Sequence, residues 1–225
     1  MIKLHYLNNS RAQRILFMLE EMGIPYETEV FFREKNLAPT TLKNVHPLGK
    51  SPVITDGDLT IAESGAIIEY LAEKYGKGSM IPEGEFDHPD VLAYKYWLHY
   101  AEGSLMPLLV MKLIFDRINN AKMPFFVKPI AKRIVEQVMT SYLAPNIETH
   151  MGYVENHLFS HKWFAGNSFS AADIQMLFPL EASVRQEEIA EKYPNIKAYV
   201  DRVQARPAYQ RALTAGEPYA FANQK

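Results

Sequence analysis

The spacing of apolar positions changes character near residue 77. Before that point, short alternating stretches predict strands, and stretches with apolar residues every three or four positions predict helices. The strands are expected at 2–7, 25–32, 53–55 and 59–61, and the helices at 11–23, 39–45 and 63–76. The first strand, helix and strand form a βαβ unit with parallel strands. Asp56-Gly57 between the last two strands favours a tight hairpin, so we expect a four-stranded mixed sheet with helices on its faces.

After residue 77 the strand pattern disappears. Residues 78–89 are rich in Gly, Pro and charged residues, a composition typical of a connector. The remaining apolar periodicity is helical, with prolines at the expected starts, ends or kinks. We expect helices near 90–120, 125–142, 145–158, 170–185 and 194–205. The chain is therefore predicted to be α/β plus all-α, with one domain over 1–77, a linker over 78–89 and an all-helical domain over 90–225.

Composition narrows the classes of function. The 225 residues carry 24 basic and 26 acidic side chains, a net charge of −2, which gives no reason to expect nucleic acid as a partner. No apolar run reaches the length of a membrane span, and the N-terminus does not resemble a signal peptide. The absence of cysteine excludes disulfides and a cysteine nucleophile, and it is compatible with a reducing compartment. We expect no metal site.

Two short motifs are candidates for chemistry. In "TIAESGAIIEYL" a helix opens with Glu63, Ser64 and a glycine, where backbone amides lack partners. Ser64 is either a plain N-cap or part of a ligand site. In "HPLGKSPVI" two prolines and a glycine flank Lys50 immediately before a strand. Proline cannot donate to a ladder, so Pro52 belongs at the start of that strand.

The order of these motifs resembles the cytosolic glutathione transferases. A βαβ unit with a Ser at its first helix, "PLGKSPVI", "ESGAIIEYL" and an all-helical second half occur in the same order in that family. "EGSLMP" and "AKMPFF" further resemble a fungal and bacterial group that includes one of the yeast enzymes. The resemblance implies a thioredoxin-like N-terminal domain, a cytoplasmic homodimer and a role in detoxification.

The resemblance also assigns a glutathione site. It implies that Ser64 binds the γ-glutamyl carboxylate by amide and hydroxyl, and that Glu63 binds the ammonium group. The proline of Ser51-Pro52 is cis in the family, and Val53 exchanges backbone hydrogen bonds with the cysteinyl amide. Lys50 matches the position whose cation meets the glycyl carboxylate, although most lysines are simply solvated.

A catalytic donor to the glutathione sulfur is expected near the first helix. A hydroxyl or amide that donates to sulfur stabilises the thiolate and not the thiol. Ser10 is the first choice, with Tyr6 and Asn9 as alternatives; Ser10 is equally explained as an N-cap and Tyr6 as a buried strand residue. Arg11 and Arg14 could add positive potential there, and Arg14 could equally be a structural ion-pair partner.

The electrophile is expected between the domains, as a small apolar molecule. The candidates for its wall are on the helices near 100–125, namely Tyr100, Met106, Leu109, Met111 and Phe115, of which at least half are equally explained as core residues. "NSFSAADI" reads as a structural capping pair, Ser170 and Asp173. The expected activity is conjugation or peroxide reduction. The alternative is a non-catalytic carrier or interaction domain on the same fold, because fold does not decide between them.

Overall fold

The computed structural model of the chain describes residues 1–35, 37–76 and 78–222. Its first part is a four-stranded sheet in the order β2-β1-β3-β4. The strands are β1 (Ile2–Leu7), β2 (Tyr26–Phe31), β3 (Val53–Asp56) and β4 (Leu59–Ala62). β1 runs parallel to β2 and antiparallel to β3, and β3 is antiparallel to β4. The predicted mixed sheet is confirmed, with each strand boundary within a residue or so of the expectation.

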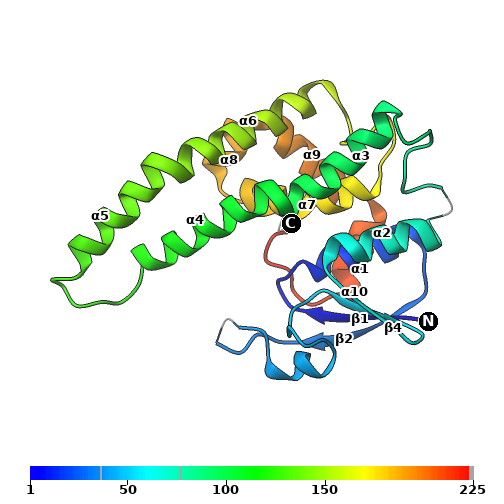
Figure 1. The fold of residues 1–225 in the computed structure, drawn as a ribbon, viewed down its shortest axis with the longest axis horizontal. Coiled ribbons are helices and arrows are strands. Elements are labelled where there is room, and N and C mark those ends of the chain that lie inside the picture. The colour runs from blue at the N-terminus through cyan, green and yellow to red at the C-terminus, as the bar shows by residue number, and fades with distance from the viewer. Residues whose placement is uncertain (36, 77, 223–225) are drawn as a thin grey trace.

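Two helices lie on the sheet face that is turned toward the rest of the molecule, α1 (Ala12–Met22) and α2 (Ser64–Tyr75) (Figure 1). The apolar stripe of α1 is fully buried, and the helix ends at Gly23, whose φ of 64° is the left-handed conformation that favours glycine. The short helix expected at 39–45 is a 3₁₀ turn, η1 (Thr40–Asn44), on the opposite face.

The described residues from 89 onward contain helices and no strand. They are α3 (Pro89–Tyr100), η2 (Ala101–Leu105), α4 (Met106–Asn119), α5 (Lys128–Val138), η3 (Met139–Leu143), α6 (Ala144–Ser160), α7 (Ala171–Val184), α8 (Glu187–Lys192), α9 (Pro194–Gln204) and α10 (Pro207–Ala215). The expected helices are present, and α8 and α10 were not identified from the sequence. The boundary expected between the first domain and the linker lies between residues 77 and 78, and residue 77 is outside the described ranges. No helix among the described residues is long and apolar enough to cross a membrane.

Pro145 was expected to separate two helices and does not, and Pro107, inside the single helix expected near 90–120, behaves in the same way. Pro107 and Pro145 each sit at the second position of a helix that follows directly from a π-helical turn, η2 and η3 respectively. Proline has no N–H, and its ring clashes with the carbonyl four residues earlier in a regular α-helix. A π turn changes that local geometry by widening the helix. The chain therefore stays helical from α3 through α4 and from α5 through α6, and the separate helices predicted around Pro145 are joined.

The centre of the second part is α7, almost all of which is buried. Its capping pair is confirmed: the Asp173 carboxylate accepts from the backbone N–H of Ser170 at 2.9 Å and of Phe164 at 3.1 Å. Because Asp173 is fully buried, desolvation raises the pKa of its carboxyl to about 6. The pair fixes the loop before α7 as well as the start of the helix.

The last helix returns to the first part of the fold. α10 packs on α1, where the rings of Tyr209 and Phe17 meet edge to face at 5.3 Å. Arg211 also pairs with Glu20 at 2.7 Å. At the other end of the molecule, α4 and α5 form a hairpin that extends away from the remaining helices (Figure 1). The contact between α1 and α10 thus joins the last helix of the chain to the first.

Candidate glutathione site

One cavity collects most of the residues singled out in the sequence. It has a volume of about 270 Å³ and lies between the β3 entry loop, the start of α2 and the helical part. Its lining consists of five of the expected binding residues and five others. The expected ones are Lys50, Ser51, Pro52, Glu63 and Ser64, and the others are Arg11, His46, Leu48, Ala62 and Glu102.

The N-terminus of α2 forms one wall of this cavity. Glu63 precedes the helix with φ 74° and ψ 121°, a conformation that non-glycine residues rarely adopt. Such backbone strain persists only where the surrounding structure holds it, and it clusters at functional sites. Ser64 is 4% exposed, and its hydroxyl has no hydrogen-bond partner among the described residues. Its oxygen therefore does not serve as a plain N-cap.

The loop before β3 forms the facing wall. Ser51 ties this loop to the end of β1, since its hydroxyl donates to the His5 carbonyl at 3.0 Å and accepts from the Leu7 N–H at 3.2 Å. The Ser51-Pro52 peptide bond is cis. Lys50 is exposed at the cavity and makes no ion pair with any described residue. Val53 is the first residue of β3, and its side chain is fully buried. In the sheet it is paired with His5 of β1 on one side and with Ala62 of β4 on the other.

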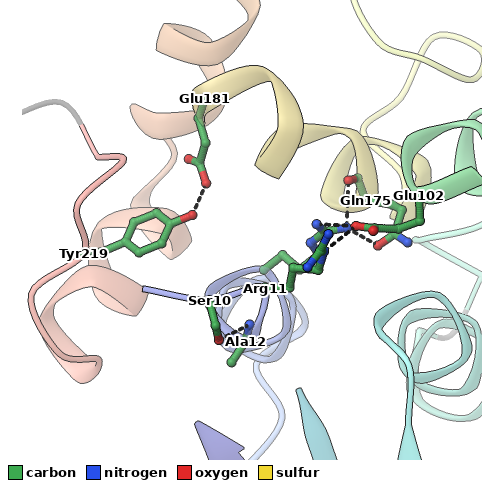
Figure 2. Close-up of polar contacts among 8 residues, drawn as sticks. Ser10, Arg11, Ala12, Glu102, Gln175, Glu181 and Tyr219 are labelled. Carbon is green, nitrogen blue, oxygen red and sulfur yellow. Dashed lines mark hydrogen bonds and ion pairs between the residues drawn. The ribbon is translucent and has the colours of Figure 1, made fainter. Parts of the chain in front are cut away.

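A partly buried ion cluster closes the cavity on the helical side. Glu102, in the π turn η2, accepts from Arg11 at 2.9 Å and from Arg14 at 2.8 Å (Figure 2). Arg14 is fully buried and also donates to the Gln175 side chain at 2.6 Å. Its burial lowers its pKa, and Glu102 opposes that shift. Of the two roles considered for Arg14, the structure supports that of a structural ion-pair partner. Of these two arginines, only Arg11 lines the cavity.

The sequence alone assigns no role to Glu102. The only local signal was its place in "EGSLMP", five residues before a helix proline. π turns occur often at functional sites, because they aim a side chain that a regular helix would place elsewhere. Here the turn puts a carboxylate against two arginines from the first part of the chain.

The three candidate donors lie beside the cavity, outside its lining. Ser10 is buried, and its hydroxyl donates to the Leu7 carbonyl at 2.7 Å and accepts from the Ala12 N–H at 3.1 Å (Figure 2). Tyr6 is 1% exposed and donates to the Gln13 side chain at 2.8 Å, and its burial raises the pKa of its hydroxyl. Asn9 is half-buried with φ 49°. Tyr6 is therefore the most enclosed of the three.

The expected electrophile wall is divided between two environments. Tyr100 is buried and its hydroxyl meets His150 on α6 at 2.6 Å. Met106 is buried in a separate apolar cluster with Phe178 and Tyr219, and Leu109 packs against the same cluster. Met111 and Phe115 lie further along α4 and are half-buried. Met106 and Leu109 are therefore the two candidates that face the C-terminal segment.

One pair of histidines has a spacing that is found in metal sites. His157 and His161 have the i, i+4 spacing of a two-histidine metal motif, and their rings stack with centroids 4.3 Å apart. Within the part of the chain that the structure describes, no group of three or more His, Asp or Glu side chains could hold a metal ion.

Comparison with known proteins places the whole chain. Residues 10–74 match the profile of the glutathione S-transferase N-terminal domain, and residues 116–207 match that of the C-terminal domain. Glutathione S-transferase 3 of Schizosaccharomyces pombe is 40% identical over 208 residues, 92% of this chain and 85% of that protein. Glutathione S-transferase 1 of Saccharomyces cerevisiae is 29% identical, covering 100% of this chain and 94% of that protein.

A solved structure agrees with this. The crystal structure of a glutathione S-transferase from Actinobacillus pleuropneumoniae superposes with a TM-score of 0.77 at 30% identity, covering 95% of this chain and 92% of that one. The sheet part and the helical part of the fold correspond to the two matched domains. The chain belongs to the glutathione S-transferase family.

Proposed function

We propose that the cavity binds glutathione and that the chain uses it as co-substrate for transfer to small apolar electrophiles. The observation that carries this proposal is that one cavity is lined both by the N-terminus of α2 and by Lys50, which makes no ion pair with a described residue. Glutathione is an extended peptide with an ammonium group and two carboxylates. The cavity lining carries charges of both signs that match these groups. Arg11 and Lys50 are positively charged, and Glu63 and Glu102 are negatively charged.

Each end of glutathione has a complementary group. The Ser64 hydroxyl and the free amides of α2 suit the γ-glutamyl carboxylate, since helix N-termini attract anions. The exposed Glu63 carboxylate suits the neighbouring ammonium group. Val53 follows the cis peptide and is proposed to pair its backbone with the cysteinyl amide, and Lys50 to meet the glycyl carboxylate. Ser51 and Pro52 hold the loop that presents them.

This pose brings the thiol toward the start of α1. A free thiol has a pKa of about 8.5, so only a few per cent is ionised at neutral pH. A donor among Tyr6, Asn9 and Ser10, together with the positive charge of Arg11, stabilises the thiolate relative to the thiol. The proton leaves to solvent. The thiolate sulfur then forms a bond to the electrophilic atom, and the electron pair of the bond that breaks goes to the leaving group or, in an addition, to the neighbouring atom, which takes a proton from solvent. The same thiolate is the species needed for peroxide reduction.

Binding is tested by calorimetric titration with glutathione. Glu63→Gln, Ser64→Ala and Lys50→Ala each remove one charged or charge-assisted contact, so each is expected to weaken binding by about tenfold or more. Glu69→Gln is the matched control, because Glu69 is on α2 but outside the cavity lining. Equal affinity in all four variants and the wild type would remove the assignment of this cavity.

We also propose that the chain acts as a cytoplasmic homodimer in detoxification. The α4–α5 hairpin exposes apolar side chains that a monomer would leave in water, including Phe125 at 87% exposed. A partner subunit is one way to cover them, and the family resemblance supports it. Light scattering after size exclusion is expected to give twice the chain mass of 25.8 kDa.

The rival reading is a carrier that binds glutathione without activating it. It predicts binding with an unchanged thiol pKa. Ultraviolet difference spectra of bound glutathione against pH separate the two, because only the thiolate absorbs strongly there. An enzyme is expected to lower the thiol pKa by a unit or more below about 8.5.

A further inference from the structure

The C-terminal segment 216–222 runs back from α10 to the start of α1. Its backbone N–H at Ala220 donates to the Asn9 side-chain oxygen at 2.8 Å, across 211 residues of sequence. Its Tyr219 ring packs with Met106 and Phe178 in the apolar cluster beside the cavity. Arg11, which lines the cavity, lies over the Phe178 ring at 5.5 Å. The segment therefore touches the same corner of the molecule as the candidate donors.

The Ala220 contact fixes which way the Asn9 amide points. A backbone N–H can only donate, so the Asn9 atom that meets it must be the carbonyl oxygen. The two N–H groups of the amide are then turned away from the segment. These N–H groups make no hydrogen bond with a described residue. The left-handed backbone of Asn9, with φ 49°, further limits where this side chain can point.

Ser10 is in the opposite situation. Its single hydroxyl proton is already donated to the Leu7 carbonyl at 2.7 Å. Donation to a sulfur would require breaking that bond and leaving a buried carbonyl without its partner, which costs free energy. Asn9 can donate without giving up any contact, so of the two it is the better prepared donor.

Glu181 anchors the segment. This carboxylate is 2% exposed, and it accepts from Tyr219 in the segment (Figure 2), from Tyr209 on α10 at 2.9 Å and from Gln204 on α9 at 3.1 Å. Gln204 also donates to the Phe221 carbonyl at 3.4 Å. Three elements thus share one buried acceptor, which holds the segment at a fixed place relative to α7.

We propose that segment 216–222 is a positioning element for thiol activation, which holds the Asn9 amide so that its N–H groups donate to the sulfur of bound glutathione. The inference rests on the proposed function, because it needs glutathione in the cavity. In it Asn9 is the catalytic residue, and Ala220, Tyr219 and Glu181 are positioning residues that act through it.

Ala220→Pro is the sharpest test, because it deletes the N–H that meets Asn9. The Ala222 N–H bonds back to the Tyr219 carbonyl at 3.4 Å, so Ala220 is the second residue of a four-residue turn. Proline is favoured at that position, so the turn tolerates it. Glu217→Ala is the matched control, since Glu217 is in the same segment and makes no hydrogen bond with a described residue.

The measurements are the pKa of bound glutathione thiol and the pH profile of kcat/KM, with calorimetric affinity for glutathione beside them. Ala220→Pro is expected to raise the thiol pKa by about one unit and lower kcat/KM at neutral pH about tenfold, the worth of one hydrogen bond to a charged group. Affinity and the Glu217→Ala control are expected to match the wild type. Tyr219→Phe, which leaves two donors on Glu181, is expected to shift the thiol pKa in the same direction.

The double variant separates positioning from a general structural effect. Asn9→Asp keeps an oxygen for the Ala220 N–H but removes both donors, so it raises the thiol pKa further. Adding Ala220→Pro to it is expected to cost nothing more, because the segment acts only through Asn9. The inference is overturned if the loss of kcat/KM in the double variant is the product of the losses in the two single variants. It is also overturned if the thiol pKa in Ala220→Pro equals that of the wild type. Wild type that binds no glutathione at all would instead overturn the proposed function.

Discussion

The buried carboxyl of Glu181 makes the stability of this protein depend on pH in a way that one substitution should remove. Burial in the core raises the pKa of Glu181 from 4.5 to about 7, against the lowering effect of its hydrogen bonds from Tyr219, Tyr209 and Gln204. A carboxyl with a raised folded-state pKa holds its proton more tightly in the folded chain. Its contribution to stability is therefore fully present below pH 4.5 and is lost as the pH rises through about 7.

The size follows from the two pKa values. Between pH 8 and pH 5 this single group adds about 2.5 kcal/mol to the free energy of unfolding, at 1.36 kcal/mol per unit of pKa difference. Glu181→Gln cannot ionise, so the variant lacks this gain. Asp173 has a raised pKa too, and His5 and His157 have lowered ones, but all three titrate equally in both proteins and cancel in the difference.

The assay is urea unfolding of wild type and Glu181→Gln at several pH values from 5 to 8. The wild-type advantage over the variant is expected to grow by about 2.5 kcal/mol as the pH falls across that range. An advantage that stays constant with pH would show that Glu181 titrates alike in the folded and unfolded chain. An advantage that shrinks on acidification would mean that its folded-state pKa is lowered, and would refute the reasoning.

Other variants test the framework of the site. Glu102→Ala leaves buried Arg14 without a carboxylate, so it should lower the free energy of unfolding by about 2 kcal/mol, measured by urea unfolding. Glu102→Gln, which keeps an acceptor, should cost less; equal losses would mean that charge is irrelevant there. Asp173→Ala leaves the buried N–H groups of Phe164 and Ser170 unpaired and should cost about 3 kcal/mol. Soluble Asp173→Ala protein should keep its affinity for glutathione, and a selective loss of affinity would contradict a structural role.

Local rules predicted the parts of this fold that are decided locally. The strands alternate, Asp56-Gly57 turns the hairpin, and Ser170 and Asp173 cap α7 through contacts three residues apart. Pro145 was wrongly expected to begin a separate helix for a related reason: proline disfavours a regular α-helix, but the outcome depends on whether the preceding turn can widen. The short helices α8 and α10 carry too few turns for a clear apolar period.

The candidate site shows where a sequence stops being informative. Lys50, Glu63 and Ser64 come together because each is adjacent to a strand or helix end in the βαβ-ββα order. Glu102 could not be assigned from its neighbours, because its partners Arg11 and Arg14 lie about ninety residues away. The contact between Asn9 and Ala220 spans nearly the whole chain, and no local pattern encodes it.

The return of α10 to α1 has a consequence for synthesis on the ribosome. Domains commonly fold in order as they emerge, N-terminal first. Here the outer face of α1, including Phe17, is covered by α10, which is among the last elements to be made. Through most of translation, the apolar face of α1 is therefore exposed to water and to other nascent chains. Completion of the C-terminus closes that face, so a chain stopped before residue 207 is the form most exposed to aggregation and to chaperone capture.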